Sequence, residues 1–194
     1  YSLTFFLVLL NLIFFLKELK KNKLLYNILF YLVSLIAAFN HIFIFIILIS
    51  QSFFLFIHYK SDIKKIFPIG FNIFAIFFSY LFLMYDSLLM QVSIQDFWIE
   101  QVKMDFFINY YFSRFFGSKI MGLIYLLILF YLLWNKKKLL LNYSNKLFLF
   151  VLILINSYFL PVIYGFVSTP ILTDRYIIFV LIAIFILISV LIFK

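Results

Sequence analysis

Two residues of the sequence have side chains suited to binding a phosphate group. Arg175 precedes the last apolar run, in Ser168-Thr169-Pro170-Ile171-Leu172-Thr173-Asp174-Arg175-Tyr176. Its guanidinium is a planar fork of donors, which at a helix N-terminus suits bidentate phosphate binding. His41 lies between two apolar arms, in Ala38-Phe39-Asn40-His41-Ile42, where an imidazole can donate to a phosphate oxygen or orient a hydroxyl. The sequence therefore offers two candidate residues for binding a phosphate group.

Both residues also have a purely structural explanation. Pro170 ends a helix, and Arg175 with Tyr176 can anchor the next helix at a membrane interface. A lone histidine at a helix turn is most often a hydrogen-bonded packing residue. Two considerations favour a functional role. A polar group at membrane depth is costly. In the membrane topology derived below, Arg175 lies on the outer side, where basic residues are disfavoured.

The segment 86–117 is the one long stretch that mixes aromatic residues with both signs of charge. From residue 106 onward its aromatic residues recur at helical intervals, which predicts an amphipathic helix in the headgroup layer. An interfacial anchor with an aromatic belt explains this pattern. The same helix can also roof an active site, with Lys103 or Arg114 meeting a lipid phosphate and Trp98 shaping the entrance.

The composition indicates that membrane-spanning helices position these residues. Of the 194 residues, 68% are hydrophobic and only 12% are charged, and the mean hydropathy is +1.20. Apolar runs close to the length of a bilayer crossing alternate with short charged clusters. We therefore expect an all-α polytopic integral membrane protein. The seven predicted spans lie at about 1–16, 24–39, 42–59, 66–85, 118–134, 147–166 and 176–193.

The distribution of basic residues decides how the long apolar block 24–59 is divided. If it folds back at Asn40-His41, twelve of the 16 Lys and Arg residues fall on one side of the membrane. A single span would divide them evenly, which contradicts the positive-inside bias. We therefore predict a helical hairpin, a Lys-rich cytoplasmic side, and an outer face that carries His41, Arg175 and the 86–117 loop. Each arm of the hairpin is slightly short for the bilayer core.

Several classes of function lack their usual signals. There is no cysteine, so disulfides and thiolate ligands are excluded, and no nucleotide-binding or hydrolase motif occurs. We expect no metal, because His41 and His58 belong to opposite sides in this topology. The net charge of +9 comes from clusters between apolar runs, so we expect no nucleic-acid partner. Because the chain begins at Tyr1 and enters an apolar run at once, we expect it to start inside a longer protein.

Three stretches carry a resemblance to a known family. The opening YSLTFFLVLLNLIFFLKELKKNKLLYNILFYLVSLIAAFNHIFIFIILISQSFFLF has a helix start, a short basic loop and a helix that ends at a histidine turn. Asp96-Phe97-Trp98-Ile99 precedes the predicted interfacial helix, and STPILTDRYIIFVLIAIFILISVLIF joins a Pro-containing loop, Arg-Tyr and a long apolar helix. This arrangement resembles C-type membrane glycosyltransferases of the polyprenyl- or dolichyl-phosphate-mannose-protein mannosyltransferase-like group. At the turn the histidine matches, and its neighbours differ from the family's Thr-His-Tyr pattern.

The resemblance implies a transferase that moves a sugar from a polyprenyl-phosphate donor to a lipid, glycan or protein acceptor on the non-cytoplasmic face, without a cofactor. It implies phosphate-binding roles for Arg175 and His41, with Lys103, Arg114, Tyr176 and Trp98 nearby. The family's catalytic carboxylate lies in its first outer loop, so the catalytic residue is expected upstream of this chain. The implied location is the bacterial inner membrane.

Two other functions remain open. One is a non-enzymatic membrane subunit of a respiratory complex or transporter, which often carries ionisable residues at mid-membrane. Here the ionisable residues are assigned to span ends, and helices broken by Gly or Pro are scarce. The other is a polymerase or ligase that uses lipid-linked glycans and shares the same geometry.

Overall fold

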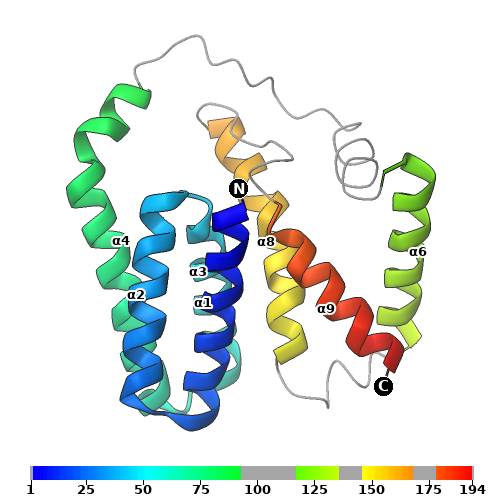
Figure 1. Cartoon of the computed structure of the whole chain (residues 1–194), viewed down its shortest axis with the longest axis horizontal. Helices are drawn as coiled ribbons and strands as arrows, with labels where there is room; N and C mark the ends of the chain where they lie inside the picture. The colour runs from blue at the N-terminus through cyan, green and yellow to red at the C-terminus, as the bar shows by residue number, and fades with distance from the viewer. Residues whose placement is uncertain (1, 93–116, 136–145, 168–177, 194) are drawn as a thin grey trace. The chain divides into compact units, whose positions relative to one another are not determined.

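The computed structural model describes residues 2–92, 117–135, 146–167 and 178–193. In these residues the chain forms seven helices and no strand, and the helices divide between two compact units, residues 1–96 and 97–194 (Figure 1). The helices of the first unit are α1 (Ser2–Lys21), α2 (Leu24–Asn40), α3 (Ile44–Tyr59) and α4 (Ile63–Val92). The helices of the second unit are α6 (Lys119–Asn135), α8 (Lys146–Val167) and α9 (Val180–Phe193). The prediction of an all-α chain is confirmed for the described residues.

By length and composition, three described helices can cross a membrane, which is fewer than the seven predicted. They are Ser2–Lys21, Ile63–Tyr85 and Lys146–Phe166. Four other apolar helices have 10–17 residues: Leu24–Asn40, Ile44–Tyr59, Lys119–Leu132 and Val180–Val190. At 1.5 Å per residue, a helix of 17 residues covers about 25 Å, against about 30 Å for the hydrocarbon core. The shorter helices therefore reach across only where they lie near the bilayer normal and the bilayer is thin or is thinned around them.

The first unit is an up-and-down arrangement of four helices joined by short turns. Asn22 and Lys23 alone connect α1 to α2. Asn22 has a positive φ of 46°, and its backbone N–H donates to the Glu18 carbonyl oxygen at 2.7 Å. This is the left-handed helix cap that asparagine tolerates better than most residues. The turn brings α1 and α2 side by side along their length (Figure 1).

The break between α2 and α3 falls at the place where the sequence predicts a hairpin. α2 ends at Asn40 and α3 begins at Ile44, so the apolar block 24–59 forms two helices. The turns after α1 and after α3 then lie at one end of the unit, and the turn between α2 and α3 lies at the other (Figure 1). Lys23 lies in the turn after α1 and Lys60 in the turn after α3. Both are therefore at the opposite end of the unit from His41.

Two helices continue well beyond the ends of their predicted spans. α1 continues to Lys21 instead of stopping near residue 16, because Lys17, Lys20 and Lys21 extend exposed side chains while Glu18 and Leu19 remain buried. α4 begins at Ile63 and continues to Val92, past the predicted end at residue 85. Residues 86–92 contain no Gly or Pro that would stop the helix.

Apolar and aromatic side chains fill the centre of the first unit. Phe15 of α1, Phe30 of α2 and Phe54 of α3 are completely buried. The Phe15 ring centroid lies 5.8 Å from that of Phe30 and 6.1 Å from that of Phe54. α4 packs on α2 and α3, with Tyr80 against Phe39 and Phe45. The three phenylalanines form a single aromatic layer across α1, α2 and α3.

In the second unit, α9 packs against α8 and α6. Its buried residues Val180, Ile184 and Leu187 recur at helical spacing, as expected for one packed face. In α8, Pro161 lacks the N–H that would bond to the Ser157 carbonyl oxygen. The Ser157 hydroxyl itself is buried and donates to the Ile153 carbonyl oxygen at 2.6 Å.

Candidate functional site

His41 is the predicted site residue that the structure describes. It follows the last residue of α2 with an extended backbone, φ −161° and ψ 123°, and its N–H donates to the Ala37 carbonyl oxygen. Its Nδ1 accepts a hydrogen bond from the Phe43 backbone N–H at 3.2 Å, and the Phe43 ring lies 5.4 Å away. The half-buried imidazole is thus held between the last turn of α2 and Phe43, the residue that precedes α3.

These contacts determine the chemistry of the ring. Burial lowers the pKa of His41 below its usual value of 6.5, because desolvation disfavours the charged form. The neutral ring therefore predominates at pH 7, and since Nδ1 accepts a hydrogen bond, its proton is on Nε2. His41 is consequently suited to donating a hydrogen bond and poorly suited to acting as a fixed positive charge.

The turn that carries His41 is held to α1 by a neighbouring polar pair. The Asn40 side-chain amide donates to the Thr4 hydroxyl at 2.8 Å, and Thr4 is buried in α1. This contact joins the start of α1 to the end of α2. The position of the histidine turn therefore depends on the packing of α1 as well as on α2 and α3.

The other predicted site residues lie outside the described residues. They are Arg175, Tyr176, Arg114, Lys103 and Trp98. The predicted interfacial helix, from residue 106 onward, also lies outside them. Their grouping with His41 stays a prediction.

A fully buried polar layer crosses the first unit, and the sequence analysis did not identify it. The Gln51 side-chain amide of α3 donates to the Asn11 oxygen of α1 at 2.6 Å. The Asn11 amide in turn donates to the Ser34 hydroxyl of α2 at 2.7 Å. Ser34 completes the chain by donating to the Phe30 carbonyl oxygen at 2.6 Å. Asn11, Ser34 and Gln51 are all completely buried, directly beside the aromatic layer of Phe15, Phe30 and Phe54.

The polar layer is part of a longer series of three polar residue pairs between α1 and α2, which we call the ladder. The buried polar residues of α1 are Thr4, Asn11 and Glu18, spaced seven residues apart, which places them on one face of the helix. Their partners in α2 run in the reverse order because the helices are antiparallel: Asn40, Ser34 and Asn27. The seven-residue spacing of Thr4, Asn11 and Glu18 was a readable signal. Hydropathy does not reveal it, because Thr4 and Asn11 are single uncharged residues within an apolar run and Glu18 lies in a charged cluster.

The last pair of this ladder, Glu18 and Asn27, is also in contact with α4. The Glu18 carboxylate faces the Lys23 backbone N–H and the Asn27 side-chain amide, although its Oε2 and Asn27 Nδ2 fall short of hydrogen-bond geometry. The Asn72 amide donates to Asn27 Oδ1 at 2.9 Å. The only buried acidic side chain among the described residues is thus surrounded by donors, which indicates a structural role at the α1–α2 turn.

Within the described ranges, no three His, Asp or Glu side chains are grouped so that they could hold a metal ion. His41 and His58 lie at opposite ends of α3. Comparison with protein-family models, curated proteins and solved structures gives no match for this chain.

Proposed function

We propose that this chain belongs to the membrane domain of a glycosyltransferase that uses a polyprenyl-phosphate-linked sugar. In this proposal all seven apolar helices span the bacterial inner membrane, with the lysine-bearing turns in the cytoplasm. The family is the polyprenyl- or dolichyl-phosphate-mannose-protein mannosyltransferase-like group, which the sequence resembles. The acceptor is a lipid, glycan or protein on the outer face.

The observation that carries the proposal is the position of His41. The histidine turn lies at the end of the first unit opposite the turns that carry Lys23 and Lys60 (Figure 1). Basic residues collect on the cytoplasmic side of membrane proteins, so His41 faces the outer side. That is the side on which lipid-linked sugar donors of this family are used.

The proposed reaction is a displacement at the anomeric carbon of the sugar. The acceptor oxygen forms the new bond to this carbon, while the bond to the phosphate oxygen breaks and its electron pair remains on the lipid phosphate. The acceptor proton passes to a carboxylate that the family resemblance puts upstream of this chain. Arg175 stabilises the departing phosphate as a bidentate cation. His41 donates a hydrogen bond from Nε2 to a phosphate oxygen.

The experiment measures sugar transfer from a polyprenyl-phosphate donor by the full-length protein in proteoliposomes. Loss of a preorganised cation at the leaving group is expected to lower turnover about 100-fold or more in Arg175→Ala. Loss of one hydrogen bond to a charged oxygen is expected to cost about tenfold in His41→Ala. His58→Ala, which changes the histidine at the other end of α3, is the matched control and is expected to retain activity.

Unchanged turnover in Arg175→Ala would remove that residue from the phosphate site. Unchanged turnover in both Arg175→Ala and His41→Ala would contradict the phosphate pocket. A full-length protein without transfer activity on any lipid-linked donor would favour a non-enzymatic membrane subunit.

A further inference from the structure

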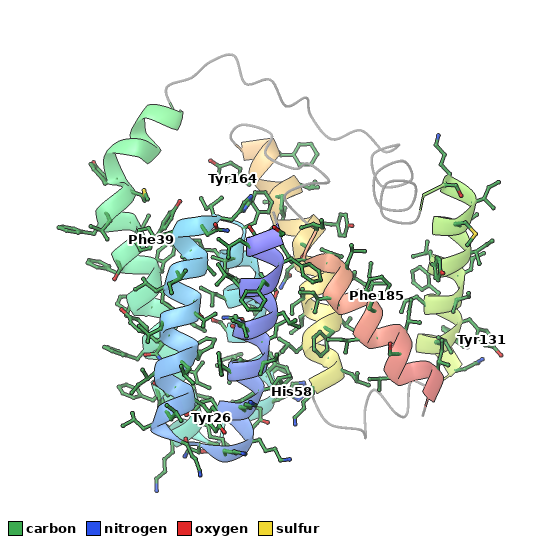
Figure 2. All side chains as sticks on the ribbon, viewed as in Figure 1. Tyr26, Phe39, His58, Tyr131, Tyr164 and Phe185 are labelled. Carbon is green, nitrogen blue, oxygen red and sulfur yellow. The ribbon has the colours of Figure 1, made fainter. Side chains whose placement is uncertain are left out.

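Two lysines of α1 converge on one tyrosine at the lysine-bearing end of the first unit. The Lys17 Nζ lies 5.6 Å from the centroid of the Tyr26 ring, and the Lys21 Nζ lies 5.5 Å from it. The Lys21 ammonium also donates to the Tyr26 hydroxyl at 3.4 Å. Both lysines are exposed. Figure 2 labels Tyr26 beside the turn between α1 and α2.

Among the described residues, no carboxylate forms an ion pair with either of these two lysines. The adjacent acid, Glu18, is buried and faces the Lys23 N–H and the Asn27 amide. Lysines four residues apart on a helix repel one another, and the negative face of an aromatic ring offsets only part of that repulsion.

A second lysine–tyrosine pair shows the contrast. The Lys65 Nζ lies 5.4 Å from the centroid of the Tyr59 ring, but it also forms a 3.0 Å ion pair with Asp62. The charge of Lys65 is therefore balanced within the protein. The cluster of Lys17, Lys21 and Tyr26 instead holds two charges beside one ring without an ion-pair partner in the described part of the chain.

We propose that the Lys17–Lys21–Tyr26 cluster binds the phosphate of an anionic phospholipid headgroup. A phosphodiester accepts charge-assisted hydrogen bonds from two ammonium groups. The cluster lies where an apolar helix meets a polar turn, which is the level of the headgroups. Exposed Lys20 and Lys23 add to the attraction of an anionic leaflet. The inference rests on membrane insertion of α1 and α2 and is independent of the transferase reaction.

The test compares two double variants that remove the same charge from the same end of the unit. The full-length protein is purified from vesicles of phosphatidylglycerol and phosphatidylcholine, and retained lipid is counted by native mass spectrometry. Lys17→Gln with Lys21→Gln is expected to weaken phosphatidylglycerol binding about tenfold for each charge-assisted hydrogen bond lost. The control is Lys60→Gln with Lys64→Gln. These two lysines are exposed and contact no ring among the described residues, so the control is expected to keep the bound lipid.

Two further variants address the tyrosine. Tyr26→Phe retains the ring and is expected to retain the lipid. Tyr26→Leu releases both lysines from the ring and is expected to weaken binding about two- to fivefold for each contact. Thermal unfolding in lipid-free detergent shows that each variant is folded before lipid binding is compared.

Equal lipid loss in the two double variants would assign the effect to diffuse leaflet attraction and overturn the site. Displacement of the lipid by inorganic phosphate would overturn its assignment to a lipid headgroup. Retention of phosphatidylcholine as strongly as phosphatidylglycerol would also overturn it. A protein that binds the lipid but transfers no sugar would contradict the proposed function alone.

Discussion

The Gln51 amide donates a 2.6 Å hydrogen bond to the side-chain oxygen of Asn11, and neither residue is exposed. This bond joins α3 to α1. The Asn11 amide donates in turn to Ser34 of α2, so one asparagine connects three helices. Helices in lipid gain little hydrophobic energy from pairing, so specific polar contacts and close packing determine which faces meet. Asn11 therefore fixes the rotation of α1 against both of its neighbours.

Replacement of Asn11 by leucine is expected to destabilise the first unit by about 1–2 kcal/mol. The change leaves the Gln51 amide without its acceptor and the Ser34 hydroxyl without its donor. Ser34→Ala is expected to cost less, because the main loss is one acceptor for Asn11. Unfolding in bicelles or mixed micelles measures these differences in the free energy of unfolding.

Ser52→Ala is the matched control for Ser34→Ala. The Ser52 hydroxyl donates to the Leu48 carbonyl oxygen of its own helix at 2.9 Å and has no hydrogen bond to a second helix among the described ones. It is expected to change stability by no more than about 0.5 kcal/mol. Equal effects of Ser34→Ala and Ser52→Ala would show that the bond between α1 and α2 contributes nothing measurable.

The two ends of the first unit are expected to lie on opposite sides of the membrane. Because the chain contains no cysteine, a single introduced cysteine reports its own position. Ile42→Cys lies in the histidine turn and Ser61→Cys in the turn between α3 and α4, and both positions are exposed. A membrane-impermeant thiol reagent is expected to label the Ile42→Cys protein from outside intact cells, and the Ser61→Cys protein only in inverted vesicles.

Permeabilised membranes provide the control, since both cysteines must then react. Labelling of both positions from the same side would show that α3 does not cross the bilayer. It would also remove the basis for assigning His41 to the outer face.

The helical class of the described residues, and the apolar blocks in which their helices lie, could be read from the sequence, whereas the seven membrane spans stay a prediction. The charge distribution located the break between α2 and α3, because only a hairpin at Asn40-His41 collects the basic residues on one side. α1 continues to Lys21, past Lys17, which is the first lysine after the predicted span 1–16, and the end of the membrane span itself stays a prediction. A long lysine side chain reaches water from within a helix, so the helix continues past its first lysine.

The polar layer was not predictable from hydropathy. Asn11, Ser34 and Gln51 are isolated within apolar runs, and sequence distance alone does not show that they meet. They come together only once the α1–α2 turn sets the antiparallel register. The polar layer is seen in the structure, whereas the candidate phosphate site stays a prediction. Arg175 lies outside the described residues, and its grouping with His41 rests on the predicted topology.

His41 is expected to make stability depend on pH in mildly acidic solution. Burial of the ring lowers its folded-state pKa below 6.5, so the unfolded chain binds the proton more readily. The contribution to stability is therefore fully present above the unfolded pKa, and it is lost as the pH falls from about 7 toward the folded-state pKa. Protonation of Nδ1 would also remove the acceptor for the Phe43 N–H.

His41→Asn is the informative variant, because an amide oxygen can still accept the Phe43 N–H but does not titrate. Thermal unfolding is measured between pH 7.5 and pH 5.5 for both proteins. The variant is expected to lose less stability in acid than the parent protein. Parallel losses in the two proteins would assign the pH dependence to other groups.

The turn between α1 and α2 is expected to be sensitive to substitution at Asn22. Its φ of 46° is a left-handed conformation that costs most residues about 1–2 kcal/mol. Asn22→Val is therefore expected to lower the free energy of unfolding by at least about 1 kcal/mol. Asn22→Gly is expected to be neutral or stabilising, because glycine adopts this conformation without strain.

Asn22 is exposed, so neither variant removes a buried contact, and the difference between them reports mainly the backbone preference. Because α1 and α2 are joined by two residues, a strained turn also shifts the register of the ladder from Thr4 to Glu18. A disulfide between cysteines introduced at Thr4 and Asn40 reports this register, and it is expected to form more slowly in Asn22→Val than in Asn22→Gly. Equal stability and equal crosslinking in the two variants would show that the left-handed cap does not set the α1–α2 register.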